Sequence, residues 1–127
     1  MITNTKRPKF LNLFKIHLPV TGVTSFAHRV SGALLFVSLP FWIYIFSLSL
    51  HNEASFKIAQ GYLTSAWTKL ALLVLLWSIL HHLLAGIRFL LLDIHLGNSL
   101  KSARRSAWLV NFAGIITFVA LALWWLL

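Results

Sequence analysis

The sequence has 127 residues, of which 59% are hydrophobic and only two are acidic, so it lacks the surface charge of a water-soluble domain and is typical of a protein embedded in a lipid bilayer. The absence of cysteine excludes disulfides, iron–sulfur ligation and thiolate metal sites. The net charge of +9 does not indicate nucleic-acid binding, because the basic residues flank apolar runs and form no known binding motif.

The first apolar run covers residues 30–50. Pro19 precedes it, and proline fits the first turn of a helix because its missing N–H would have no partner there. We therefore expect the first helix to begin near residues 19–21, ahead of the run itself. Five polar residues then lie on this helix before the run: Thr21, Thr24, Ser25, His28 and Arg29.

Two further apolar runs cover residues 70–92 and 107–127. Each run approaches the roughly 20 residues that a helix needs to cross about 30 Å of hydrocarbon. The second run contains His81, His82 and Arg88, which makes it the most polar of the three. The pattern predicts an all-α membrane protein with three transmembrane helices.

Basic residues are concentrated on one side of the expected membrane. Five precede the first run and three lie between the second and third runs, whereas the loop between the first and second runs has two. The five before the first run are Lys6, Arg7, Lys9, Lys15 and Arg29. The three between the second and third runs are Lys101, Arg104 and Arg105, and the two in the loop are Lys57 and Lys69. Because basic residues favour the inner side, we predict that the N-terminus lies inside and the C-terminus outside. The three spans form one predicted transmembrane domain over residues 1–127.

His82 is the deepest ionisable residue, about 15 Å from the inner end of its helix at about 1.5 Å per residue. Ionisable side chains are costly in a bilayer, and a neutral imidazole at this depth is a good iron ligand. Ser78 and Gly86 lie one turn on either side of His82 and would leave space for the flat macrocycle of a haem. Alternatively, these small residues form a helix-packing seam, and His82 bonds to a neighbouring helix.

His28 is expected near the inner boundary, on the order of 10 Å or more from the depth of His82. It is therefore too far away to bind the same haem iron, and the second axial ligand would have to come from a partner chain. His28, Arg29 and Arg88 lie toward the inner side of His82, where guanidinium groups can neutralise haem propionates. An alternative stays open for each arginine. Arg29 could instead be an anchor whose side chain snorkels to the membrane interface. Arg88 could instead pair with Asp93.

Ser25 and Arg29 are four residues apart and therefore neighbours on one helix face. A hydroxyl and a guanidinium group at the inner interface can hold the carbonyl oxygen of a quinone. The alternative is that Ser25 bonds back to a carbonyl of its own helix.

Two segments carry recognisable motifs. Residues 18–32, LPVTGVTSFAHRVSG, contain the element S-x-x-H-R-x-[ST]-G, and residues 82–93, HLLAGIRFLLLD, contain H-x-x-x-G-x-R-x-x-x-x-D. Both elements, at these places in two successive spans, resemble the family of cytochrome b556 subunits of succinate dehydrogenase. The similarity in motifs and span layout covers nearly the whole chain.

This resemblance implies roles for individual residues. His82 is the axial haem ligand, and His28 and Arg29 lie near the haem propionates. Ser25 and Arg29 contribute to a ubiquinone pocket. Further supporting positions are Gly86, Arg88 and Asp93.

The resemblance also implies a complex in which a flavoprotein oxidises succinate and an iron–sulfur subunit passes electrons to the membrane. This chain and a second small membrane anchor subunit would share one haem b, each supplying one axial ligand, and would help to form the ubiquinone-reduction site. The expected location is the inner membrane, with a bacterial cytoplasmic membrane favoured over a mitochondrial one. The alternatives are an anchor of a fumarate reductase or menaquinol-linked complex, and a small proton or ion transporter subunit with His81, His82 and Arg88 as a relay.

Overall fold

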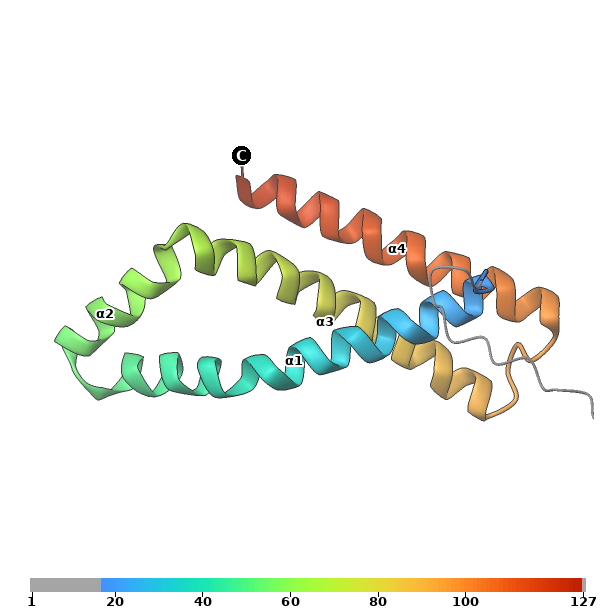
Figure 1. Ribbon diagram of the computed structural model, residues 1–127, viewed down its shortest axis with the longest axis horizontal. Helices are drawn as coiled ribbons and strands as arrows, with labels where there is room; N and C mark the ends of the chain where they lie inside the picture. The colour runs from blue at the N-terminus through green and yellow to red at the C-terminus, as the bar shows by residue number, and fades with distance from the viewer. Residues whose placement is uncertain (1–16, 127) are drawn as a thin grey trace, which may run out of the picture.

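The computed structural model describes residues 17–126, which contain four helices and no strand. The helices are α1 (Val20–His51), α2 (Glu53–Thr64), α3 (Ala66–Asp93) and α4 (Leu100–Leu126). Figure 1 shows them in chain order. Three of the four, α1, α3 and α4, are long and apolar enough to cross a membrane. The prediction of an all-helical chain with three membrane-spanning helices is confirmed at this level.

Helix α1 begins directly after Pro19, whose carbonyl oxygen accepts hydrogen bonds from the N–H groups of Gly22 and Val23. It includes the ten residues that precede the apolar run as well as Pro40. Its 32 residues correspond to a length of about 48 Å, more than the roughly 30 Å of a hydrocarbon core. One part of α1 therefore extends beyond the apolar layer of a membrane.

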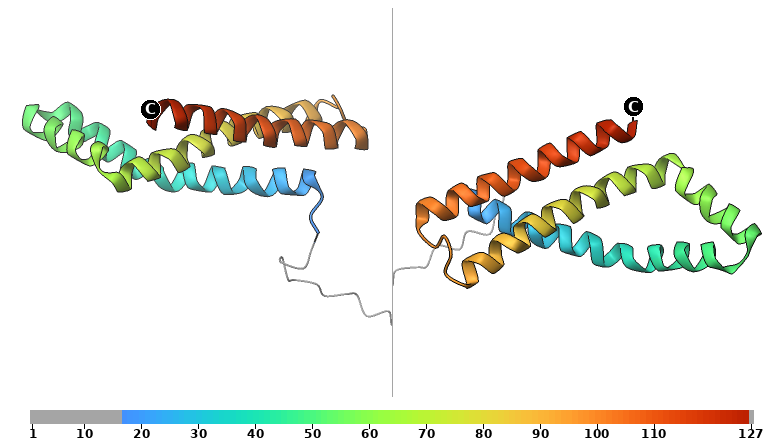
Figure 2. Two further views of the ribbon diagram at one scale, coloured as in Figure 1. Left: turned by 90° about the horizontal axis from the view of Figure 1, so that it is seen from above. Right: turned by 180° about the vertical axis from the view of Figure 1, so that it is seen from behind.

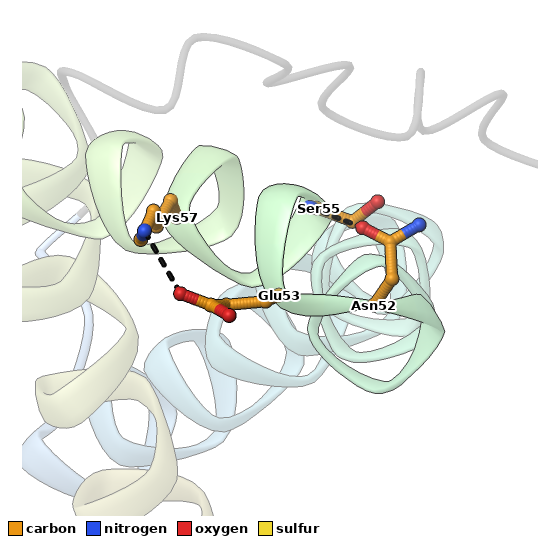
Figure 3. A network of polar contacts seen from close by, with 4 residues as sticks. All are labelled: Asn52, Glu53, Ser55 and Lys57. Carbon is orange, nitrogen blue, oxygen red and sulfur yellow. Dashed lines mark hydrogen bonds and ion pairs between the residues drawn. The ribbon is translucent and has the colours of Figure 1, made fainter.

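Helix α2 lies in the segment that the sequence analysis described as a loop, and that description is wrong. The side chain of Asn52 caps this helix by accepting a hydrogen bond of 2.8 Å from the N–H of Ser55. One turn further on, Lys57 and Glu53 form an ion pair of 2.9 Å on the exposed surface, as Figure 3 shows. The cap and the ion pair stabilise a helix too short and too polar to be detected as a span.

The helices meet at the end of the molecule where α1 begins, α3 ends and α4 begins, as both Figure 1 and Figure 2 show. We call this the basic end, because three exposed basic side chains lie in the first turns of α4: Lys101, Arg104 and Arg105. Helix α2 connects α1 and α3 at the opposite end. The two ends of α3 are thus in different surroundings, one packed between helices and one beside α2.

Small side chains form the contacts between the long helices. The most deeply buried residues are Thr24 and Ser31 of α1, Ser78 and Ala85 of α3, and Ala107 of α4, each fully buried. Large hydrophobic side chains are exposed on all three long helices. Packing through small residues is typical of membrane helices, whose outer surface contacts lipid or other chains.

Candidate functional site

The imidazole of His82 extends from α3 toward α1. Its Nδ1 atom lies 3.1 Å from the carbonyl oxygen of His28 and 3.3 Å from Oγ of Ser31. The Ser31 hydroxyl donates its own hydrogen to the same carbonyl at 2.8 Å, so its oxygen acts as an acceptor toward the ring. Both neighbours of Nδ1 accept, which assigns the proton of the neutral ring to Nδ1 and the lone pair to Nε2.

His28 stacks on His82, with ring centroids 4.0 Å apart and the planes inclined by 14°. The expectation that the two histidines differ in depth by 10 Å or more is wrong. His28 follows the start of α1 by eight residues, and His82 precedes the end of α3 by eleven, so the antiparallel helices bring them together. His28 also makes an edge contact with the ring of Phe89, at 5.2 Å between centroids.

Gly32 allows the close approach of these rings, and Gly86 lies beside one of them. A Cβ atom on Gly32 would lie 2.8 Å from Cε1 of His82, which is closer than real Cβ contacts. A Cβ on Gly86 would lie 3.5 Å from Nε2 of His28, an ordinary contact distance. Gly86 thus lies beside the His28 side chain of α1, and His82 bonds to the backbone of α1. Both contacts are typical of a packing seam between two helices. The role of Gly32 was missed, although it is the last residue of the first motif segment.

His81 faces a different neighbour from His82. Its ring is 4% exposed, stacks on Trp77 with centroids 5.4 Å apart, and has Gly114 of α4 beside it. Within the described residues, its Nε2 atom is buried and has no hydrogen-bond partner. His81 therefore contacts Gly114 of α4, whereas His82 bonds to the His28 carbonyl of α1.

Arg88 lies on the same buried stripe of α3 as His81. Its Nε donates to Oγ of Ser106 and its Nη2 to the carbonyl of Ala103, both at 3.0 Å. Asp93 is exposed, and within residues 17–126 it forms no ion pair with Arg88. The structure thus directs Arg88 to α4 and does not bring it to His82.

Ser25 and Arg29 lie one turn apart on α1, near the basic end. Ser25 is half-buried and Arg29 is exposed. Neither side chain makes a hydrogen bond to another residue in the part of the chain that the structure describes. Among the described residues, a hydroxyl and a guanidinium group therefore lie on this face without a side-chain partner.

Comparison with known proteins gives consistent relatives. Residues 3–121 match the family described as succinate dehydrogenase/fumarate reductase transmembrane subunit. The succinate dehydrogenase cytochrome b556 subunit of Coxiella burnetii is 36% identical over 122 residues, which cover 95% of this chain and 98% of that protein. The proteins of the same name from Rickettsia bellii and Paracoccus denitrificans are 28% and 25% identical, over 91% and 96% of this chain and 90% and 93% of their own lengths. The chain therefore belongs to the family of succinate dehydrogenase/fumarate reductase transmembrane subunits.

Proposed function

We propose that this chain is the haem b-binding membrane anchor subunit of a succinate dehydrogenase complex and helps to form its ubiquinone-reduction site. One observation carries the proposal. His82 lies between two apolar helices with its Nδ1 proton held by a main-chain carbonyl and its Nε2 lone pair unused by that bond. Relatives of this chain are named cytochrome b556 subunits, and this name indicates a b-type haem that the imidazole could bind.

The donor set fits an axial haem ligand. Histidines that bind metals usually donate their other ring N–H to a carbonyl or carboxylate, which fixes the tautomer and strengthens the ligand. When bound, haem b supplies one-electron transfer at an iron without an open coordination site. The face-to-face stack of His28 on His82 does not point two ring nitrogens at opposite sides of one metal ion. We therefore propose that a second small anchor subunit would supply the other ligand.

His28 and Arg29 are proposed to lie near the haem propionates. They are adjacent on α1, and the ring of His28 already contacts that of His82. The exposed guanidinium of Arg29 can bond a carboxylate through two N–H groups. In this role Arg29 neutralises negative charge at the membrane boundary.

Ser25 and Arg29 are proposed to hold ubiquinone. The Ser25 hydroxyl and the Arg29 guanidinium would bond one carbonyl oxygen of the quinone, and the positive charge of Arg29 would stabilise the negative charge that develops on that oxygen. Protons for the reduced quinone would come from the inner aqueous side. This arrangement uses the polar start of α1, which extends ahead of the apolar run.

The proposed partners are the second anchor subunit, the iron–sulfur subunit and the flavoprotein, in a bacterial inner membrane. The three named relatives are bacterial proteins. Because the family description includes fumarate reductase, an anchor that works with menaquinol in the reverse direction is the second candidate.

The decisive experiment compares His82→Ala with His81→Phe in the complex purified with its partner subunits. We expect the reduced-minus-oxidised spectrum of the unmodified complex to show the bands of a low-spin b haem, His82→Ala to lose them and His81→Phe to keep them. His81 is the matched control because it is the neighbouring histidine and contacts a different helix. Absence of haem from the unmodified complex, or an unchanged spectrum in His82→Ala, would contradict the proposal.

A further inference from the structure

Arg88 carries a buried positive charge that no carboxylate within residues 17–126 neutralises, although the ring of Phe89 lies 5.2 Å from its guanidinium carbon. Its side chain is 5% exposed, and both of its hydrogen bonds go to neutral groups, a hydroxyl and a carbonyl. The full sequence has only two acidic residues, Glu53 and Asp93. Glu53 is in α2 at the other end of the molecule, and within residues 17–126 neither carboxylate pairs with Arg88. Since an unpaired buried charge is costly, its counter-ion must come from outside the chain.

A pocket of about 430 Å³ opens beside this guanidinium group, between α3 and α4 at the basic end. Its polar lining consists of Arg88 with Ser102 and Ser106, which lie in the first two turns of α4. Leu109 and Val110 line it one turn deeper along the same helix. The pocket therefore has a polar part near the membrane boundary and an apolar part toward the membrane interior.

We infer that this pocket binds one acidic phospholipid, with the headgroup phosphate on Arg88 and an acyl chain along the apolar wall. Arg88 has five N–H donors, and its two bonds within the chain use two of them, so others are free for phosphate oxygens. A carboxylate of another subunit would match the charge but would not need the adjoining apolar wall. A phospholipid matches both.

Electrostatics favour an anionic headgroup at this position. Three exposed basic side chains lie on the adjacent turns of α4: Lys101, Arg104 and Arg105. Each basic residue near a membrane surface attracts acidic lipid and raises its local concentration. Arg88 is then the buried side chain that bonds directly to the headgroup phosphate.

The test measures phospholipid that copurifies with the detergent-washed complex, by extraction and mass spectrometry. We expect the unmodified complex to retain an acidic phospholipid and Arg88→Met to bind it on the order of tenfold more weakly, as for loss of a charge-assisted hydrogen bond. Lys69→Met is the matched control, since it removes one exposed positive charge from the other end of α3. It should retain the lipid.

A second variant covers the case that Arg88→Met does not assemble. Ser102→Trp fills the polar part of the pocket and leaves the arginine in place. Phosphatidylglycerol micelles should raise the thermal unfolding midpoint of the unmodified complex and of Lys69→Met, but not of Ser102→Trp. Phosphatidylcholine and inorganic phosphate are the comparison ligands and should have little effect.

Three outcomes would overturn the inference: equal lipid retention in Ser102→Trp and the unmodified complex, equal stabilisation by phosphatidylcholine, or equal stabilisation by inorganic phosphate. The first assigns the counter-ion to another subunit, and the others remove the preference for an acidic lipid. The visible spectrum is recorded on the same samples. Loss of lipid with haem retained separates this site from the proposed haem site.

Discussion

Gly32 sets the distance between the backbone of α1 and the ring of His82. We predict that Gly32→Ala greatly reduces haem incorporation, because its Cβ would lie 2.8 Å from Cε1 of His82 and force that ring away from the His28 carbonyl. The measurement is the haem-to-protein ratio of the purified complex.

Gly61 provides the control for this substitution. It lies in α2, and a Cβ added there meets nothing within 4 Å. Gly61→Ala should leave haem content unchanged and stabilise α2 by up to about 1 kcal/mol, as for glycine replaced in a helix. If Gly32→Ala incorporates as much haem as Gly61→Ala, the close contact does not position His82.

Ser25 and Arg29 are predicted to act on quinone and not on succinate. Ser25→Ala should raise the KM for ubiquinone about fivefold, because one hydrogen bond between neutral groups is worth roughly 0.5–1.5 kcal/mol. Arg29→Ala should reduce quinone reduction further. Reduction of a soluble dye by the flavoprotein and iron–sulfur subunits should continue in both variants.

Ser38→Ala serves as the control for Ser25→Ala. Ser38 is in the same helix, and its hydroxyl bonds back to the carbonyl of Leu35. Normal quinone kinetics in both serine variants would exclude Ser25 from the quinone pocket.

At the residue scale, the sequence predicts that His82 is the deepest histidine, but it does not predict which atoms surround it. His28 is expected near the inner boundary of the membrane, whereas its ring stacks directly on that of His82. The contact between His28 and His82 depends on how two helices cross, and residue spacing within one helix does not contain that information.

At the element scale, α2 depends on its cap. We predict that Asn52→Ala destabilises this helix by about 1 kcal/mol, the usual value for an N-cap, and speeds amide hydrogen exchange in its first turns about fivefold. Lys57→Ala removes the exposed ion pair and should change exchange much less. Equal effects of the two substitutions would mean that the Asn52 side chain does not cap the helix.

Hydropathy predicted the three long helices because length and composition alone decide whether a helix can span a membrane. It did not predict which face of α3 is buried. Apolar residues lie on every face of that helix, so hydropathy gives only a weak contrast for the stripe that contains Ser78, His81, Ala85 and Arg88. Contacts with α1 and α4 select this stripe, and they require the tertiary arrangement.

At the scale of the whole molecule, orientation is open to a direct test, because the chain has no cysteine of its own. We predict that a membrane-impermeant maleimide added to spheroplasts labels Lys57→Cys and not Lys101→Cys, as the charge distribution requires. Both positions are exposed, so accessibility within the protein does not bias the comparison. The reverse labelling pattern would invert the proposed topology.

The acceptor for the Nδ1 proton of His82 is a peptide carbonyl, not a side chain. Amino-acid replacement at position 28 therefore changes the stacked ring and leaves the acceptor unchanged. A loss of haem in a His28 variant would therefore be due to the stacked ring or to the proposed propionate contact, and not to a change in the tautomer of His82.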